Sequence, residues 1–484
     1  MKISELLENL FSIAGVQKTD FAIAMNISPS SLSKILSGKT IPIAEEKNQF
    51  SKKAAHFFAE SIYEYDCHLK FKNIFPLLYD FRSMYELKVF LIHAIDYALE
   101  NNYSSRKNDA IFEHNNKTDS FIGRESVLNM ACIIISDYYR KNVDNQIEIS
   151  SSLRLFSQLY YDIFKHIKFT IPKKIRNINY NHFFDLDTFE KTYKNHDFCT
   201  VEKIVNSRKS LNLNLFEMKM DSDSSFLLMK GQFLLLFNVL MDGTLLMTFI
   251  NKDSYLSKFE NSLIKKNPQK FSYTRSEAID ILKENPALFE NVIKEKIDRI
   301  YSFLPLGFLI EKNDFEQING HKYILDIIMK IFNKVVTEDT DVYISTDAIT
   351  EFLITGEIVI PLIGMIDIEE KERINYYIRL DKYLNEHNIN KVKIVDSKLP
   401  KLAFLCAEGL SILYVMGDEY KDEKIHILKT NVFNEVLESK ISNGNVHTIE
   451  LDTVLKDTYL KKFSKKFFDN EIEVENVQEK IIDI

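Results

Sequence analysis

The spacing of apolar residues divides the chain into a helical first part and a later part that is richer in strands. Residues 84–102 and 125–141 carry apolar side chains at helical spacing. After about residue 195 the pattern changes to short apolar runs typical of strands, at 214–220, 226–231, 232–239 and 244–250, followed by a helical stretch at 251–266. Asp242-Gly243 is a good hairpin turn between two of these runs. The pattern predicts a multidomain α+β fold.

A second group of strand-like runs follows, at 389–395, 402–408, 410–416 and 424–429, and a helical stretch closes it at 430–441. At a shift of 178 residues the two groups keep the same order without a gap. The matched pairs are Phe226 with Phe404, Ile250 with Leu428, Tyr255 with Phe433, Phe259 with Leu437, and Leu263 with Ile441. This match indicates a duplicated unit. The alternative is that any two antiparallel meanders look alike when both are built from apolar residues.

Residues 16–42 predict two short helices around a sharp turn. The first helix has an apolar face of Phe21, Ala22 and Met25. Asn26 stands at the turn, where asparagine tolerates a left-handed backbone better than most residues. Ser28 is then a good N-cap, Pro29 suits the first helical position, and Gly38 ends the helix. The second helix buries Leu32, Ile35 and Leu36 and turns outward Ser30, Ser31, Ser33, Lys34 and Ser37. This is the layout of a helix-turn-helix unit.

Residues 3–60 resemble the lambda-repressor-like, xenobiotic-response-element (XRE) family of bacterial and phage regulators. The segments that carry the resemblance are ISELLENLFSIAG, VQKTDFAIAMNIS, PSSLSKILSGKTIP and AEEKNQFSKKAAHFF. Asn26 stands where the family more often has glycine, and Lys18 where it often has glutamine. Lys18 would therefore replace a directional hydrogen bond to a phosphate by a point charge.

We expect the second helix of this unit to lie in the major groove of double-stranded DNA, with Ser30, Ser31, Ser33 and Lys34 toward the base edges. Gln17 and Lys18 would face a phosphate at the start of the preceding helix, and Lys39 would add a backbone contact. Ser28, at the N-cap, completes the predicted DNA-binding residues. Residues 17–39 carry three lysines against Asp20, a weak positive charge that favours a homodimer on two half-sites. The alternative is a helix-turn-helix kept only for packing or protein contacts.

The composition fits a globular protein and excludes a polycation. The chain has 484 residues, of which 45% are hydrophobic and 27% charged, and its net charge is −8. The four cysteines are far apart in sequence, so we expect reduced thiols and no metal site. No uninterrupted apolar run is long enough to span a bilayer, and we expect a soluble, cytoplasmic protein with no membrane partner. No phosphate loop or catalytic constellation is recognised, so we expect neither a cofactor nor an enzyme.

These observations predict four regions. They are a helix-turn-helix domain at 1–60, a helical linker or dimerisation region at 61–170, an α+β domain with an antiparallel sheet at 171–340, and a second α+β domain at 341–484, a candidate repeat of the preceding one.

The leading hypothesis is a sequence-specific transcriptional regulator, a repressor, that binds DNA as a dimer. The large remainder would serve oligomerisation and the sensing of a small-molecule, peptide or protein effector. One alternative is an enzyme or toxin-like effector fused to an autoregulatory helix-turn-helix head. Another is a peptide-sensing receptor, although no tetratricopeptide-like period is found.

Overall fold

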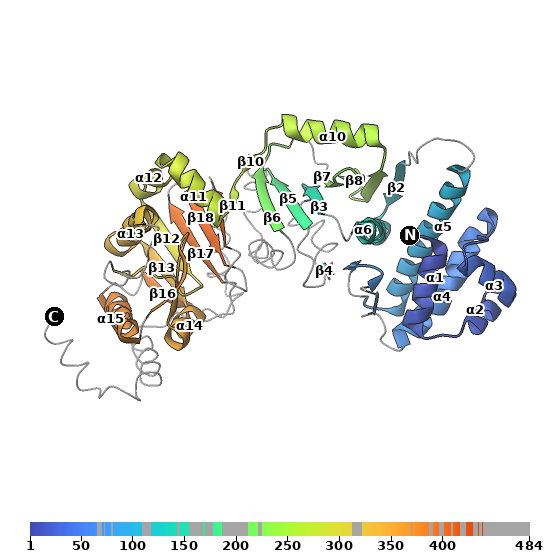
Figure 1. Ribbon diagram of the computed structural model, residues 1–484, viewed down its shortest axis with the longest axis horizontal. Helices are drawn as coiled ribbons and strands as arrows, with labels where there is room; N and C mark the ends of the chain where they lie inside the picture. The colour runs from blue at the N-terminus through green and yellow to red at the C-terminus, as the bar shows by residue number, and fades with distance from the viewer. Residues whose placement is uncertain are drawn as a thin grey trace. The chain divides into compact units, whose positions relative to one another are not determined.

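The computed structural model describes most of the chain, in two units (Figure 1). The described residues are 1–64, 70–71, 73–78, 81–108, 118–142, 146–153, 168–169, 178–185, 212–220, 225–311, 322–368, 370–386, 391–395, 401–407, 410–416, 423–428, 434 and 438. The first unit is formed by residues 1–185 and 210–269, and the second is assigned residues 186–209 and 270–484. Each unit contains helices and strands, which confirms the predicted multidomain α+β class. None of the described helices is long and apolar enough to cross a membrane.

The first unit opens with a small helical head. Its elements are α1 (Ile3–Ala14), α2 (Lys18–Ala24), α3 (Pro29–Leu36), the short 3-10 helix η1 (Ala44–Glu46) and α4 (Lys47–Glu64). Four phenylalanine rings form its centre, with neighbouring ring centroids 5.1–5.4 Å apart, contributed by Phe11, Phe21, Phe57 and Phe58. Edge-on and offset ring contacts of this kind add to the stabilisation from burial itself. The predicted all-α N-terminal domain is therefore present.

Two longer helices, α5 (Met84–Asn108) and α6 (Arg124–Lys141), hold the head within the first unit. The α-ammonium group of Met1 forms a buried ion pair with Asp137 of α6. The backbone N–H of Ile3 donates to the side-chain oxygen of Asn102 on α5 at 2.9 Å. Arg140 on α6 binds the carboxylate of Glu5 at 2.5 Å. The beginning of the chain is thus fixed to α5 and α6 by polar contacts.

The first sheet has, within the described residues, the strand order β10-β6-β5-β3-β7-β8-β9-β2. The strand bounds are Thr118–Ile122 (β2), Ile147–Ser151 (β3), Ile178–Phe184 (β5), Asn212–Glu217 (β6), Ser225–Met229 (β7), Phe233–Val239 (β8), Leu245–Ile250 (β9) and Gln269–Lys270 (β10). A separate short pair joins β1 (Leu77–Leu78) and β4 (Lys168–Phe169).

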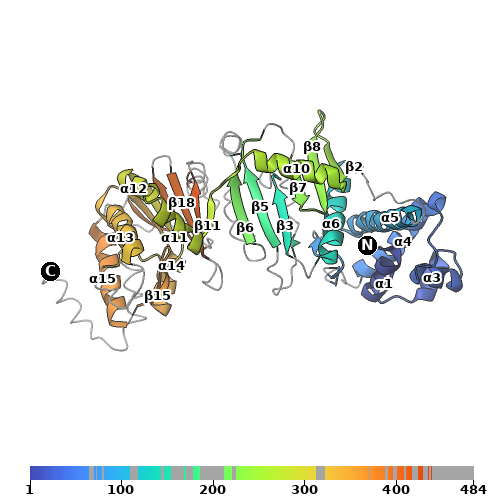
Figure 2. The same cartoon turned by 45° about the horizontal axis from the view of Figure 1, so that its top comes forward.

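Helices cover both faces of this sheet. On one face, Tyr138 of α6 packs against Phe233, with ring centroids 4.8 Å apart. On the other face lies α10 (Asp253–Lys265), whose Phe259 packs edge-on against Phe226 at 5.0 Å. Figure 2 shows α10 lying across the strands.

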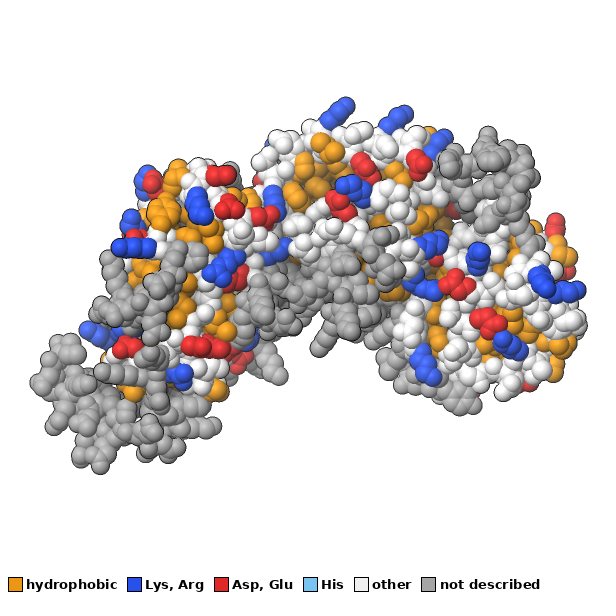
Figure 3. Space-filling view, in the orientation of Figure 1, with side chains coloured by type: hydrophobic (Ala, Val, Ile, Leu, Met, Phe, Trp, Pro, Cys, Tyr) orange, Lys and Arg blue, Asp and Glu red, His pale blue; other side chains and the backbone are white. Residues whose placement is uncertain are grey.

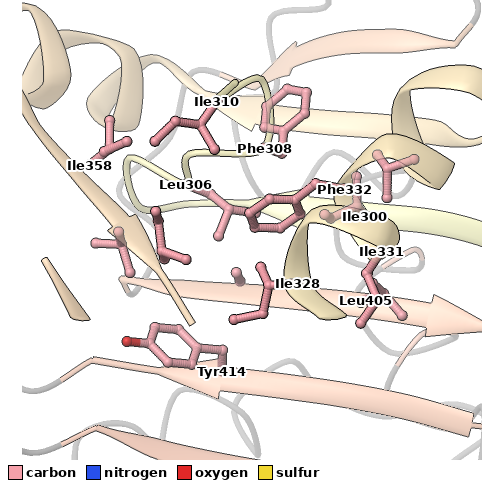
Figure 4. Packing of buried hydrophobic residues seen from close by; sticks show 14 of the residues in the cluster. Ile300, Leu306, Phe308, Ile310, Ile328, Ile331, Phe332, Ile358, Leu405 and Tyr414 are labelled. Atoms are coloured by element: carbon pink, nitrogen blue, oxygen red, sulfur yellow. The ribbon is translucent and has the colours of Figure 1, made fainter. Parts of the chain in front are cut away.

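The second unit contains a sheet in the order β11-β19-β18-β17-β12-β13-β16. The strand bounds are Ser272–Thr274 (β11), Ile297–Ser302 (β12), Asp341–Ser345 (β13), Val392–Val395 (β16), Leu402–Ala407 (β17), Leu410–Val415 (β18) and Lys424–Leu428 (β19). A hairpin of β14 (Glu357–Ile360) and β15 (Gly364–Asp367) stands apart from it. The helices are α11 (Arg275–Glu284), α12 (Ala287–Lys294), α13 (Lys322–Thr337), α14 (Thr346–Thr355) and α15 (Glu370–Glu386). Residues of α11, α13, α14 and α15 share one apolar core with the sheet, part of which is shown in Figure 4.

Apart from β10, which extends the first sheet beside β6, the two sheets have the same strand order among the described residues. In the first sheet, the parallel strands β3, β5 and β6 are followed by the antiparallel meander β7 to β9, and β3 pairs with β7. In the second sheet, the parallel strands are β12, β13 and β16, the meander is β17 to β19, and β12 pairs with β17. In each sheet an earlier strand, β2 or β11, pairs with the last strand of the meander. Phe226 on β7 and Phe404 on β17 occupy matching strands, as do Ile250 and Leu428. The predicted partners Phe433, Leu437 and Ile441 lie outside the described residues.

The sequence-based description differs from the structure in two respects. The sheets are mixed rather than antiparallel, because each contains three parallel strands. The predicted boundaries at 170 and 340 each cut through a sheet, since β2 and β3 of the supposedly helical region 61–170 pair with later strands, and β12 pairs with β17. Parallel strands need long crossovers, so their partners lie far apart in sequence and leave no local hairpin pattern.

Candidate nucleic-acid interface

The turn between α2 and α3 has the geometry that the sequence predicted. Asn26 adopts a positive φ of 57°, and the N–H of Ile27 donates to the carbonyl of Ala22 at 3.0 Å. Ser28 is the N-cap of α3, and its hydroxyl accepts a hydrogen bond from the N–H of Ser31 at 3.1 Å. Pro29 follows at the first helical position, where it has no N–H to leave unsatisfied. The direction of α3 is therefore fixed at its first turn.

One side of α3 is buried in the head and the other is exposed. Leu32 and Ile35 are only 2% and 7% exposed. The predicted DNA-binding residues are all exposed: Gln17, Lys18, Ser28, Ser30, Ser31, Ser33, Lys34 and Lys39. The structure thus places these residues on the surface of α2, α3 and the turn after α3, and it brings the serines and Lys34 together on one helix.

The serines at the start of α3 are linked to one another. The Ser28 hydroxyl lies 2.9 Å from the hydroxyls of both Ser30 and Ser31. A hydroxyl has one donor and two acceptor positions, so Ser30 and Ser31 keep capacity for further partners, whereas the three contacts of Ser28 use all of its positions. At the other end of the helix, the Ser37 hydroxyl donates to the carbonyl of Lys34 at 3.1 Å. The first turn of α3 therefore presents a pre-arranged set of hydroxyl groups.

Lys18 has a partner that the sequence did not predict. Its ammonium group lies 2.7 Å from a carboxylate oxygen of Glu8 on α1, and both side chains are about half exposed, 52% and 46%. The same ammonium lies 5.8 Å from the ring centroid of Phe11. An approaching phosphate would compete with Glu8 for this lysine. Lys18 would therefore be a weaker phosphate contact than a lysine whose charge is uncompensated.

A surface hollow lies where α1, α2 and α3 meet. Its lining residues are Glu8, Lys18, Thr19, Pro29, Leu32, Ser33, Leu36 and Ser37. Glu8 and Thr19 were not among the predicted candidate residues. Glu8 belongs to α1, and only the packing of the head brings it beside Lys18. The exposed position of Glu8 on amphipathic α1 was a signal that it faces outward, but not that it faces Lys18.

The head has little net charge. Residues 1–64 contain seven lysines, seven acidic residues and no arginine. On the face of the head seen in Figure 3, basic and acidic side chains are interspersed. Without arginine the head lacks the side chain that most often reads guanine through two parallel hydrogen bonds. Serine hydroxyls and Lys34 would carry any contact with base edges, and phosphate contacts would be few.

Among the described residues, no group of three or more His, Cys, Asp or Glu side chains is arranged to hold a metal ion. The described cysteines, Cys132 and Cys406, are buried, and burial raises the pKa of both thiols well above its usual range. A thiol with a raised pKa stays protonated and is a poor nucleophile.

Comparison with known proteins gives little further information. No family model and no curated protein matches the chain. One similar solved structure is described as TrmBL2, an archaeal chromatin protein with a novel mode of DNA binding. The match covers 43% of this chain and 83% of that one, at 10% identity and a TM-score of 0.21. A likeness this weak supports no conclusion about the fold or function of this chain.

Proposed function

We propose that the chain is a sequence-specific DNA-binding transcriptional regulator of the lambda-repressor-like, XRE type that acts in the cytoplasm as a homodimer. The observation that carries this proposal is the surface of α3. It is polar and exposed on one side, buried through Leu32 and Ile35 on the other, and capped by Ser28 at an asparagine turn. This combination suits a helix that enters the major groove.

In the proposed complex, the first turn of α3 approaches the base edges. Ser30, Ser31 and Ser33 donate to or accept from the bases, and Lys34 donates to them. Gln17 and Lys18, at the start of α2, and Lys39, after α3, face phosphates and fix the orientation of the helix.

Dimerisation follows from the small number of basic residues. Each head places two lysines, Lys18 and Lys39, against phosphates, so one copy would neutralise about two phosphates and bind weakly at physiological salt. Two copies on adjacent half-sites double this number and also double the base contacts. The logarithm of affinity should then fall with the logarithm of salt concentration with a slope of about −4 for a dimer, against about −2 for a monomer.

The remainder of the chain is proposed to hold the dimer contacts and to sense an effector. A head of some sixty residues suffices for docking, and the two sheet-containing regions add surface that DNA binding alone does not need. Repression is the proposed outcome, because two bound chains of 56.7 kDa would cover the DNA beside their site.

The proposal is tested with DNA selected from a random pool by the full chain. Fluorescence anisotropy then compares the chain with a variant that carries Ser31→Ala and Lys34→Ala. Each copy of the variant lacks the Ser31 hydroxyl and the Lys34 ammonium group. Because each good base contact contributes about 1–3 kcal/mol, we expect the variant to bind DNA at least tenfold more weakly. Light scattering should show an unchanged oligomeric state.

The matched control is Lys258→Ala, which removes one exposed lysine from α10, outside the head. This control variant should bind the selected DNA with an affinity within about twofold of that of the unmodified chain. Equal binding by the chain and the Ser31→Ala, Lys34→Ala variant would contradict the proposed role of α3. Equal losses in that variant and in Lys258→Ala would indicate nonspecific attraction to charge.

A further inference from the structure

The hollow where α1, α2 and α3 meet is large enough to hold a small molecule. Its volume is about 340 Å³. Since a cavity of about 150 Å³ accommodates benzene, this hollow has room for about a dozen non-hydrogen atoms. Phe11 of α1 packs edge-on against Phe21 of α2 at 5.2 Å, so the helices that form its walls are fixed against each other. The hollow is therefore preformed, as ligand sites usually are.

Its lining combines apolar side chains with hydroxyl groups. The apolar side chains are those of Pro29, Leu32 and Leu36. The hydroxyl groups are those of Thr19, Ser33 and Ser37. Pro29, Ser33 and Ser37 follow one another at intervals of four residues, so they form one stripe along α3. An apolar surface with a few polar groups beside it is the usual lining of a small-molecule site.

Two opposite charges complete the lining. Glu8 and Lys18 both line the hollow, and their carboxylate and ammonium groups lie 2.7 Å apart. Both side chains are about half exposed. An ion pair this exposed contributes little to stability, so a ligand can separate the two groups at small cost. The lining therefore offers one negative and one positive group, side by side, to a ligand.

From this lining we infer that the hollow binds a free α-amino acid with an apolar side chain. The ammonium group of the ligand pairs with Glu8, its carboxylate pairs with Lys18, and its side chain covers the apolar part of the lining. The two charges of an α-amino acid are attached to one carbon atom, so they require counter-charges that lie as close together as these two do. A ligand with a single charge would occupy one member of the pair and leave the other without its partner.

Binding of the amino acid opposes DNA binding at the same surface. Lys18 and Ser33 line the hollow, and both belong to the proposed DNA contacts. A ligand carboxylate on Lys18 takes the place of a DNA phosphate, so the amino acid and DNA weaken each other's binding by the same factor. The amino acid would thus release the regulator from its site. This consequence rests on the proposed function, whereas the ligand site itself does not.

Saturation-transfer NMR titrations on the full chain, without DNA, test the site with four probes. They are L-leucine, 3-methylbutylammonium, 4-methylpentanoate and glycine, which carry both charges and an apolar chain, lack the carboxylate, lack the ammonium group, and lack the apolar chain. We expect leucine to bind with a dissociation constant of about 1 mM, in keeping with its few atoms. The singly charged probes should bind about two- to fivefold more weakly, and glycine at least about fivefold more weakly.

Two variants of the full chain assign each charge of the ligand to its partner. Glu8→Gln should abolish the preference for leucine over 4-methylpentanoate, and Lys18→Gln should abolish the preference for leucine over 3-methylbutylammonium. The matched controls are Glu46→Gln and Lys52→Gln, which make the same changes of charge at exposed residues of the head outside the hollow. Both controls should keep both preferences. Thermal unfolding shows whether each variant is folded.

The unmodified chain alone can overturn the inference, so the test does not depend on the variants. Absence of signal from all four probes would refute the hollow as a site. Equal affinities for leucine and either singly charged probe would refute the ligand class. Folded Glu8→Gln and Lys18→Gln chains that keep both preferences would place the ligand elsewhere and overturn the inference.

Fluorescence anisotropy with the selected DNA tests the regulatory consequence separately. Leucine at ten times its dissociation constant should weaken DNA binding at least about tenfold if the two compete for one surface. Glycine at the same concentration should have a much smaller effect. Leucine that binds the chain without weakening DNA binding would contradict the shared surface. A chain that binds leucine but no DNA would support the ligand site and contradict the proposed function.

Discussion

Ser28 has two roles that can be separated by substitution. It caps α3 through the N–H of Ser31, and its hydroxyl contacts those of Ser30 and Ser31. Ser28→Ala should therefore cost about 1 kcal/mol of stability, the usual loss for a serine N-cap. Ser33→Ala, on the exposed side of the same helix, should leave the stability within about 0.5 kcal/mol and weaken DNA binding instead. Urea denaturation and anisotropy on both variants check this contrast, and it is wrong if the two lose equal stability.

Glu8 is predicted to restrain DNA binding. Because its carboxylate holds the Lys18 ammonium at 2.7 Å, Glu8→Gln should release that lysine for a phosphate and remove a negative charge beside the DNA. Exposed ion pairs contribute about 0–1 kcal/mol, so the affinity should rise a fewfold. Anisotropy at low and high salt measures the gain, which should shrink as salt screens it.

The control is Glu46→Gln, which makes the same change of charge at an exposed residue of η1. It should alter the affinity less than Glu8→Gln. If Glu8→Gln weakens binding, Lys18 does not face a phosphate and the proposed orientation of α2 is wrong.

At the residue scale, the sequence predicted the turn and the outward face of α3 but not the surroundings of Lys18. Asn26, Ser28 and Pro29 act through their own backbone geometry, so their roles are visible in a local sequence. The pairing of Lys18 with Glu8 depends on how α1 packs against α2, ten positions away. The ion pair between Arg275 and the buried Glu423, at 4.0 Å, was missed for the same reason, since the two residues lie far apart in sequence.

At the scale of single elements, strand β5 carries a pH-sensitive residue. His182 is 3% exposed and lies between Tyr180 and Phe184, with ring centroids 6.1 Å and 4.4 Å away. Burial lowers the pKa of His182 from 6.5 to about 3. Between these two values the unfolded chain binds a proton at this residue and the folded chain does not. Stability should therefore fall as the pH decreases through this window, by about 1.4 kcal/mol per pH unit from this histidine.

Urea denaturation at several pH values between 7.5 and 4.5 measures this effect, with His182→Gln as the comparison. The variant cannot bind this proton. Below pH 6, its free energy of unfolding should therefore change by about 1.4 kcal/mol per pH unit less than that of the unmodified chain. Parallel pH profiles for the two proteins would show that His182 is accessible to protons in the folded state.

The elements themselves were largely predictable where pairing is local. The meander strands β7 to β9 and β17 to β19 lie within a few residues of the expected runs, because hairpins place turn residues between apolar stretches. Strands β2 and β3 were not recognised as part of a sheet. Each has only five residues, and each pairs with a strand far along the chain. Such pairings are set by the fold as a whole and not by any local pattern.

For the whole molecule, Asp137 ties the beginning of the chain to the first unit. Besides the Met1 ammonium, its carboxylate accepts from Tyr97 at 3.0 Å and from Lys141 at 2.8 Å. Asp137→Asn would leave a buried positive charge without its counter-charge, and we expect a loss of about 3 kcal/mol in the free energy of unfolding. Glu5→Gln removes the nearby, partly exposed ion pair with Arg140 and should cost under about 1 kcal/mol. Urea denaturation compares them, and equal losses would contradict the structural role of Asp137.

The shared topology of the two sheets gives a physical reason for the length of the chain. Each sheet pairs three parallel strands with a meander and has buried apolar residues of its own. The match at a shift of 178 residues included the meander strands and the runs that became β6 and β16, while the other parallel strands emerged only from the strand pairing. The described chain thus contains one small helical head and two sheets of similar strand order.

The central claim, that α3 enters the major groove, is tested most directly by methylation interference on the selected DNA. Methyl groups at guanine N7 lie in the major groove, and those at adenine N3 lie in the minor groove. We predict that guanine N7 methylation blocks binding at two clusters about 10 base pairs apart, one for each head of a dimer, and that adenine N3 methylation between them does not. Interference confined to adenine N3, or none at either position, would contradict the account.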